Sequence, residues 1–231
     1  MELDQSNFLD GKLLLINKPL NWTSFQVVNK IRWLIKSKFN LKNIKVGHAG
    51  TLDPLATGLL IICTGKMTKK ISSFQNLNKS YEGKFIIGAT TPSYDLETKI
   101  SSKNSFEHIK KGDLLEVSKK FIGKIKQKPP VFSAIKIKGK KLYDYAREGK
   151  SVKIPYREIT ISNFKITKIN LPEVDFEIDC SKGTYIRSIA NDFGKELKVG
   201  AFLKSLCRTT IGKHQLKDAI SIQSFENLFK N

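Results

Sequence analysis

Residues 47–58 of the chain read Gly47-His48-Ala49-Gly50-Thr51-Leu52-Asp53-Pro54-Leu55-Ala56-Thr57-Gly58. Three glycines and one proline in twelve residues are incompatible with a long helix or a plain strand, so a loop is expected here. Its only acid, Asp53, has mainly apolar neighbours, and a carboxylate in such surroundings costs free energy unless a cation or hydrogen bonds compensate it. This pattern is typical of a catalytic acid, base or nucleophile. The alternative is an Asx-turn, in which Asp53 binds the amides that follow it.

The stretch resembles, almost residue for residue, the catalytic motif of the TruB family of tRNA pseudouridine synthases. Members of this family isomerise the position-55 uridine in the T loop of tRNA, and the resemblance implies that Asp53 is the catalytic carboxylate. It also implies that His48 lies at the active site, where the imidazole would fill the gap left by the flipped base or steady the loop. The alternative for His48 is simple packing, because no acid lies beside it in the sequence.

The composition indicates a globular protein with a polyanionic partner. The 231 residues include 41 Lys and Arg against 21 Asp and Glu, a net charge of +20, and 40% of them are hydrophobic. A nucleic acid or an anionic membrane surface would attract such a charge. No apolar run approaches the roughly 20 residues that span a bilayer, and the first residues lack the order of a secretion signal. A nucleic acid is therefore the expected partner, with no membrane association and a cytoplasmic location.

The cysteines and histidines give no sign of a metal site. Cys63, Cys180 and Cys207 are odd in number and widely spaced, so we interpret them as reduced core thiols of a cytoplasmic protein. The sequence contains neither a Cys/His cluster with metal-ligand spacing nor a phosphate-binding loop. We therefore expect no metal and no cofactor.

The hydrophobic pattern predicts the order of helices and strands. A buried strand over 12–17 and a helix from Thr23 or Ser24 to Phe39 come before the glycine-rich loop. Between them, Asn21 stands where the family usually has glycine, and asparagine tolerates the left-handed backbone that this turn requires. The other expected elements are strands over 59–63, 80–88, 159–166 and 174–180, helices over 67–77 and 105–121, a helix from Thr184 that stops at Gly200, and one closing helix over 213–231.

The strand over 80–88 carries the second motif. Lys79-Ser80-Tyr81, followed by the run from Gly88 to Asp95, resembles the family motif in which a tyrosine packs on the target uracil. The resemblance implies this role for Tyr81. The alternative is an ordinary cross-strand aromatic residue, because Tyr81 also fits the apolar face of an alternating strand.

Residues 121–150 form a strongly basic segment, with nine Lys or Arg against two acids, a local net charge of +7. Basic side chains interleaved with Phe132, Tyr143 and Tyr145 suit a surface that follows phosphates and stacks bases, although a run of charge is often only a solvated face. The segment resembles the inserted thumb with which the family grips the T arm, and we expect this insertion at about 121–152. The residues expected to contact RNA are Lys18, Lys128, Lys136, Lys138, Lys140, Lys141, Arg147 and Arg208.

The strand over 174–180 runs into Ser181-Lys182-Gly183-Thr184-Tyr185-Ile186-Arg187, where a helix is expected to begin. A cation in the first turn opposes the helix dipole unless an anion lies close, and Asp53 is the candidate anion. In the family, the arginine of this motif pairs with the catalytic aspartate and the tyrosine lies beside the reacting nucleotide. The resemblance implies these roles for Arg187 and Tyr185. The alternative is a surface arginine and a packing tyrosine.

The resemblance continues through Leu206-Cys207-Arg208-Thr209. The family commonly has two arginines here, and Cys207 replaces one of them, which would remove a phosphate contact. The core role of Leu206, which the resemblance implies as a support of the active site, is unaffected.

Taken from about Gly11 to Asp218, the resemblance implies an α+β pseudouridine synthase fold: a mixed, mostly antiparallel sheet flanked by helices, with the basic thumb inserted. We expect one catalytic domain over 1–231, without the C-terminal RNA-binding (PUA) domain that many members carry. The expected substrate is the T arm of tRNA. The protein is expected to act as a monomer without an obligatory protein partner.

The implied reaction flips the uridine out of its stack, cuts the N1–C1′ bond, turns the uracil and rejoins it through C5. Asp53 would either attack the sugar or the ring covalently, or take the C2′ proton on a glycal route. Arg187 would keep Asp53 ionised, and Tyr185 is a candidate for the C5 proton. Two other functions stay open. A non-enzymatic basic RNA-binding protein would carry the same charge, and a guide-RNA-dependent pseudouridine synthase would share the motifs.

Overall fold

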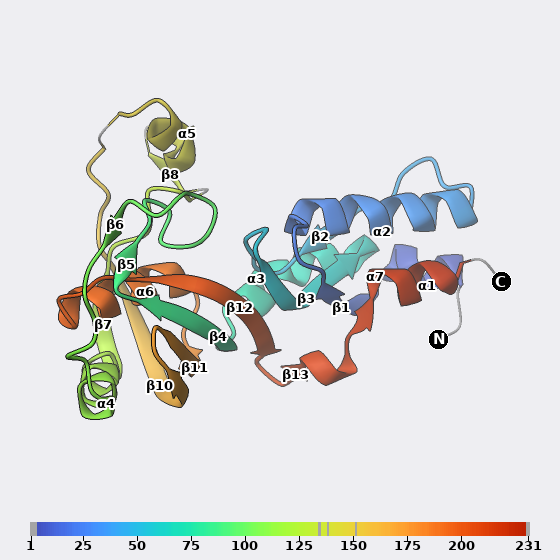
Figure 1. Cartoon of the computed structure of the whole chain (residues 1–231). Helices are drawn as coiled ribbons and strands as arrows, with labels where there is room; N and C mark the ends of the chain where they lie inside the picture. Colours follow the sequence, from blue (N-terminus) through green and yellow to red (C-terminus); the bar gives the residue numbers. More distant parts are fainter. Residues whose placement is uncertain (1–3, 134, 138, 151, 230–231) are drawn as a thin grey trace. The chain divides into compact units, whose positions relative to one another are not determined.

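The structure is a computed structural model, drawn in Figure 1, that describes residues 4–133, 135–137, 139–150 and 152–229. These residues form two compact units. Unit 1 comprises the chain up to Tyr81 and again from Leu206 onward, and unit 2 is the continuous stretch Glu82–Ser205. The chain passes from one unit to the other inside two strands, β4 (Lys79–Ile87) and β12 (Ala201–Ile211). Each unit is described by itself.

Unit 1 is built on a mixed sheet in which the strands follow the order β14-β1-β3-β12. The central pair of β1 (Leu13–Lys18) and β3 (Ala56–Thr64) is antiparallel, whereas β14 (Ile220–Ser221) runs parallel to β1 and β12 runs parallel to β3. Two short strands, β2 (Val46–His48) and β13 (His214–Gln215), pair with β3 and β12. The pattern places the start of β3 beside the middle of β12.

The longest helix of unit 1, α2 (Ser24–Lys38), covers one face of this sheet. It begins where the sequence predicts, because Thr23 and Gln26 form a reciprocal capping box. Its buried residues repeat at helical spacing and pack on Leu14, Ile16, Leu60 and Ile62 of the strands, together with α1 (Gln5–Asp10) and α7 (Ile222–Asn227). The opposite face is covered by η1 (Gly65–Lys70), α3 (Ile71–Gln75) and η2 (Leu216–Asp218).

Unit 2 contains the strand order β4-β11-β10-β7, with β11 (Glu173–Cys180), β10 (Arg157–Asn170) and β7 (Gly123–Gln127). The pairings β10–β11 and β10–β7 are antiparallel. Its core is aromatic: the ring of Phe85 stacks on that of Phe176 with centroids 4.1 Å apart, and Phe121, Phe164 and Phe193 surround the pair. Helices α4 (Lys111–Lys120) and α6 (Ile186–Glu196) contribute to this core. The pair β5 (Ala89–Thr90) and β6 (Ser102–Lys103) forms a small second sheet.

The basic segment, residues 121–150, includes β7 and continues beyond it in unit 2. It contains the hairpin of β8 (Lys136–Ile137) and β9 (Lys140–Lys141) and the short helix α5 (Leu142–Arg147). Figure 1 shows α5 and β8 set apart from the strands β7, β10 and β11 of the same unit. Beyond β7, the segment is thus an excursion of the chain between β7 and β10.

The α+β architecture with a mostly antiparallel sheet agrees with the prediction, and three element predictions were wrong. The helix expected over 105–121 begins only after Lys110, because the Asp113 carboxylate accepts from the Lys110 amide and fixes the start there. The helix expected over 67–77 is divided into η1 and α3. The closing helix expected over 213–231 is replaced by β13, η2, β14 and α7, since Ile220 pairs in parallel with Ile16.

Cys63 and Cys180 are buried, as core thiols should be, and burial raises the pKa of Cys63 to about 11. Cys207 is only half-buried, so its assignment to the core was wrong. Among the described residues, none of the helices has the length and apolar character needed to span a membrane.

Candidate active site

Asp53 lies in unit 1, in the loop of residues 49–55 that connects β2 to β3 and is called here the Asp53 loop. The backbone on both sides of Asp53 is fixed. The Leu52 amide donates to Ser24 Oγ at 2.9 Å, the Ser24 hydroxyl lies 3.1 Å from the Leu52 carbonyl oxygen, and the Ala56 amide donates to the Asp53 carbonyl at 3.0 Å. Leu52 is buried, and Asp53 is half-buried. The loop therefore presents one carboxylate from a backbone that the start of α2 and the start of β3 hold in place.

The second anchor of the loop is Lys18, at the end of β1. Its side chain is fully buried, and Nζ donates to the carbonyl oxygens of Trp22 at 2.5 Å, Pro19 at 2.8 Å and Pro54 at 3.4 Å. Burial lowers the pKa of Lys18 to about 8, although the negative charge of Asp53 opposes this shift. The Pro54 carbonyl also accepts from the Asn21 amide at 2.8 Å, and Asn21 has the left-handed backbone (φ 64°) expected of it.

The third anchor is Arg208 on β12, which is 1% exposed. Its guanidinium donates from Nε to the Leu59 carbonyl at 2.8 Å and from Nη2 to the Gly50 carbonyl at 3.0 Å. Glycine is needed at position 58, where φ is +104° and a Cβ would lie 2.4 Å from the Arg208 carbonyl oxygen. The close approach of β3 and β12 thus brings the arginine under the loop.

Lys18 and Arg208 were expected to contact RNA, and the structure corrects this assignment. A side chain that is 0% or 1% exposed offers no surface to a phosphate, and the donors of both residues point at backbone carbonyls of the loop and its flanks. Their hydrogen bonds hold the backbone of the Asp53 loop and of the residues beside it.

His48 ends β2 and is half-buried. Burial, the largest effect, and the positive charge of Arg208 lower its pKa, while a hydrogen bond to the Gly50 backbone raises it. The lowered pKa favours the neutral imidazole, and Nδ1 is buried without a hydrogen-bond partner among the described residues. A role of His48 in steadying the loop stays a prediction. Its role toward a flipped base stays a prediction.

Tyr81 and Leu206 are the other unit 1 residues assigned to the site. Tyr81 lies on β4 and is 8% exposed. Leu206 is half-buried on β12, opposite Ala56 in the parallel register, and its carbonyl accepts from Thr57 Oγ1 at 3.4 Å. The stacking of Tyr81 on a uracil stays a prediction.

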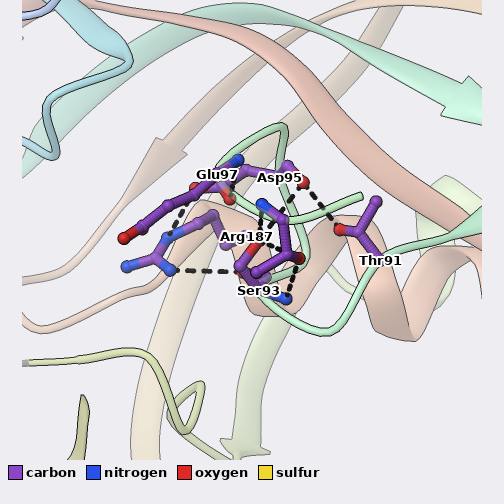
Figure 2. Close-up of polar contacts among 6 residues, drawn as sticks. Thr91, Ser93, Asp95, Glu97 and Arg187 are labelled. Carbon is purple, nitrogen blue, oxygen red and sulfur yellow. Dashed lines mark hydrogen bonds and ion pairs between the residues drawn. The ribbon is translucent and has the colours of Figure 1, made fainter. Parts of the chain in front are cut away.

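Arg187 lies in unit 2, in the first turn of α6, and is 4% exposed. Figure 2 shows its guanidinium against the loop of residues 91–98. Nε lies 3.6 Å from Asp95 Oδ2, and Nη1 donates to the Ser93 carbonyl at 3.2 Å. The alternative of a surface arginine is wrong, because a buried cation with a carboxylate partner is part of the core. Pairing between Arg187 and Asp53 concerns two different units and stays a prediction.

Asp95 is the residue that the sequence interpretation missed. Its Oδ1 accepts from the Glu97 amide at 3.0 Å, and its backbone carbonyl accepts from the hydroxyls of Thr91 at 2.7 Å and Ser93 at 3.2 Å (Figure 2). Asp95 therefore organises the 91–98 loop and fixes Arg187 at once. The available signal was its place as the acid that closes the second motif.

The helix expected from Thr184 begins instead at Ile186. Tyr185 is therefore the N-cap residue of α6 and not part of its first turn. The Gln127 side chain at the end of β7 holds it: Nε2 donates to the Tyr185 carbonyl at 3.1 Å, and Oε1 accepts from the Tyr185 amide at 2.8 Å. One turn further, the Ser188 hydroxyl donates to the Lys128 carbonyl at 2.8 Å. The start of α6 is thus tied to the end of β7.

The basic segment presents several of the cations expected to contact RNA. Lys128, Lys136 and Arg147 are exposed, and Lys140 and Lys141 are half-buried. Lys140 forms an ion pair with Glu148 and lies 5.2 Å from the Tyr145 ring centroid, and Arg147 lies 5.3 Å from that of Tyr143. Lys138 is outside the described residues. These are cation–π contacts within the segment, and RNA contact there stays a prediction.

Within the described ranges, no three or more His, Cys, Asp or Glu side chains gather in a way that would hold a metal ion.

The chain is similar to known proteins in its family pattern, its sequence and its fold. Residues 36–186 match the model of the TruB family pseudouridylate synthase N-terminal domain. The tRNA pseudouridine synthase B of Flavobacterium johnsoniae is 57% identical over 95% of this chain and 96% of its own length. That of Phocaeicola vulgatus is 51% identical, over 95% of this chain and 93% of its own length.

Among solved structures, a chain of a Cbf5-Nop10-Gar1 complex superposes with a TM-score of 0.71 at 25% identity. The alignment covers 96% of the present chain and 55% of that one, so the present chain spans about half the length of this structural relative. The likeness places both in one fold.

Proposed function

The chain belongs to the TruB family of pseudouridylate synthases, and from this premise we propose that it isomerises uridine 55 in the T loop of tRNA to pseudouridine, with Asp53 as the essential carboxylate. The enzyme class, an isomerase that makes pseudouridine, follows from the family. The observation that carries the assignment to Asp53 is its position: the loop holds its backbone on both sides and leaves the carboxylate half-buried.

The tRNA substrate is supported by two relatives, at 57% and 51% identity, that are both named tRNA pseudouridine synthase B. The net charge of +20 fits a polyanionic substrate. The exposed cations and rings of the basic segment supply a surface for the T arm, with Lys128, Lys136 and Arg147 as the first candidates for phosphate contacts.

The chemistry needs a fixed carboxylate. The N1–C1′ bond breaks, the uracil turns, C5 bonds to C1′, and C5 loses the proton it carried while N1 gains one, so atoms and electrons balance without an oxidant. Asp53 acts either as a nucleophile at the sugar or the ring or as the base that takes the C2′ proton. In both routes its approach must be set before the substrate arrives, and the anchors at Ser24, Lys18 and Arg208 provide this.

Three further side chains complete the proposed site. Tyr81 stacks on the flipped uracil, a contact worth roughly 1–3 kcal/mol. Arg187 is proposed to keep Asp53 ionised and to orient it, and the Asp95 carboxylate, 3.6 Å from Arg187 Nε, holds the guanidinium. Tyr185 takes part in moving the C5 proton.

A tritium-release assay tests the proposal. Purified protein alone is mixed with an unmodified tRNA transcript that carries tritium at C5 of its uridines, and tritium enters water only if C5 forms the new bond. We expect release of about one equivalent per tRNA, none with a transcript in which uridine 55 is replaced by cytidine, and none with Asp53→Asn.

The same assay decides between the alternatives. A basic RNA-binding protein without enzymatic activity would release no tritium under any condition. A guide-dependent enzyme would be inactive until a guide RNA and partner proteins are added. Activity of the protein alone on both transcripts would contradict the assignment of position 55.

A further inference from the structure

Gln127 is a buried amide whose donor and acceptor both serve one other residue. It is 2% exposed at the end of β7, and its two hydrogen bonds, 3.1 Å from Nε2 and 2.8 Å to Oε1, both go to the backbone of Tyr185. Among the side-chain groups that are uncharged at neutral pH in water, the primary amide is the one that donates and accepts side by side in this way. The contact is therefore specific for glutamine at this position.

The contact replaces a missing helix cap. Tyr185 is the N-cap of α6, and its own side chain makes no capping hydrogen bond. In a capping box, a Glu or Gln three residues inside the helix returns to the N-cap amide. In α6 the corresponding bond comes from a distant strand, since 58 residues separate Gln127 from Tyr185. The N-cap residue is thus held by β7 in addition to the first hydrogen bond of the helix, from the Ile189 amide to the Tyr185 carbonyl.

The basic segment leaves β7 at the same place in the chain. Lys128 follows Gln127 directly, and its carbonyl accepts from Ser188 on α6. Two adjacent residues at the root of the segment therefore hold the first turn of the helix that carries Tyr185 and Arg187. A shift of this root would move the backbone of both residues.

We propose that Gln127 is a positioning residue of the enzyme: its amide holds the N-terminus of α6 so that Tyr185 and Arg187 keep their reactive placement, and it joins this placement to the root of the RNA-binding segment. The inference rests on the proposed function. It assigns to Gln127 an effect on turnover, not on substrate affinity, because the amide is buried and offers no group to RNA.

Glutamate gives the sharpest test because its two protonation states differ in what they can donate. A neutral carboxylic acid reproduces the amide, with its O–H donating to the Tyr185 carbonyl and its C=O accepting from the Tyr185 amide. The carboxylate has no donor and repels the Tyr185 carbonyl, and burial raises the pKa of such a group. The charged neighbours along the chain are Lys126 and Lys128, both exposed, and Arg187, which is held by Asp95.

The experiment compares wild type, Gln127→Met and Gln127→Glu in the tritium-release assay between pH 5.5 and 8.5, with tRNA affinity and thermal midpoint measured in parallel. For Gln127→Met we expect kcat to fall about 10- to 100-fold at every pH, with KM and tRNA affinity within about threefold of wild type. For Gln127→Glu we expect a similar loss at pH 8.5 and a recovery of at least fivefold, relative to wild type at the same pH, as the pH falls to 5.5. Gln127→Met shows no such recovery.

The outcomes are distinguishable. An inactive wild type overturns the proposed function and this inference with it. An active wild type with a Gln127→Met rate within about threefold, or a Gln127→Glu profile parallel to wild type, overturns the inference alone. Should Gln127→Met fail to fold, the pH profile of Gln127→Glu decides. A role confined to folding predicts that activity and thermal midpoint, both relative to wild type, change together with pH. Recovery of activity at low pH with an unchanged relative midpoint supports positioning.

Discussion

The Asp53 loop and the 91–98 loop each rest on buried cations, but the cations are compensated in different ways. Under the Asp53 loop, Lys18 and Arg208 donate to backbone carbonyls, which are neutral dipoles, so both keep their net charge. Beside the 91–98 loop, Arg187 is matched by the Asp95 carboxylate. Neutral partners leave a positive field at the base of the Asp53 loop, and a carboxylate partner gives a locally neutral pair. The first arrangement suits a loop that carries a carboxylate, and the second fixes the position of the Arg187 guanidinium.

The largest expected effect is at the carboxylate that this field serves. Asp53→Asn should lower turnover at least about 10³-fold, or roughly 4 kcal/mol of transition-state stabilisation, because the amide is neither nucleophile nor base at neutral pH. tRNA affinity should change little, since phosphates supply most of it. Single-turnover assays and filter binding measure both quantities. Asp10→Asn is the matched control, an exposed acid of unit 1, and residual Asp53→Asn activity within about tenfold of wild type would remove Asp53 from its role.

The next effect tests the neutral pair. Asp95→Ala leaves the Arg187 charge buried without this carboxylate, and loss of one partner of a buried pair costs about 3–5 kcal/mol of unfolding free energy. Asp175→Ala is the control, because the side chains of Asp175 and Lys84 are 28% and 29% exposed, and a pair of that kind contributes about 0–1 kcal/mol. Urea unfolding of both variants gives the comparison. Equal losses would mean that Arg187 does not depend on Asp95.

The pH dependence of stability sharpens the comparison, since lysine titrates near the accessible range and arginine does not. The pKa of Lys18 is about 8 in the folded chain against 10.5 for a free lysine, so between these values the unfolded state binds the extra proton. Stability contributed by Lys18 therefore rises as the pH rises through this window. From pH 7 to 9.5 wild type should gain about 2 kcal/mol relative to Lys18→Met, as linkage of this shift requires.

Urea unfolding at the two pH values measures this difference. A free-energy gap between wild type and Lys18→Met that is the same at pH 7 and 9.5 would show that Lys18 keeps an ordinary pKa.

The smallest effect concerns the turn that carries one anchor of the Asp53 loop. Asn21 has φ 64° and donates its amide to the Pro54 carbonyl. Asn21→Ala should lose about 1–2 kcal/mol of stability, because alanine is strained in the left-handed region, and Asn21→Gly should remain within about 0.5 kcal/mol of wild type. Thermal unfolding of the two variants is sufficient. A loss with glycine as large as that with alanine would assign the effect to the asparagine side chain instead of the backbone.

Sequence alone was sufficient where the cause is local. The start of α2 follows from Thr23 and Gln26, and the turn at Asn21 follows from its tolerance of positive φ. It failed where the cause is a contact between distant residues. The residues near Ile220 do not predict its parallel pairing with Ile16. The residues near Lys18 and Arg208 do not predict that these side chains donate to buried backbone carbonyls. The same limit explains Asp95, whose partner is about 90 residues away in the chain.

The division of the chain has a consequence for the order in which the protein is made. Unit 2 is one continuous stretch, Glu82–Ser205, so all of its strands have been synthesised before the ribosome reaches Leu206. Unit 1 is then still without β13, β14 and most of β12, and the edge of β1 that β14 will cover is unpaired. We therefore expect a released fragment of residues 1–205 to hold a protease-resistant core from unit 2, while residues 4–81 stay open to cleavage in the absence of the last strands.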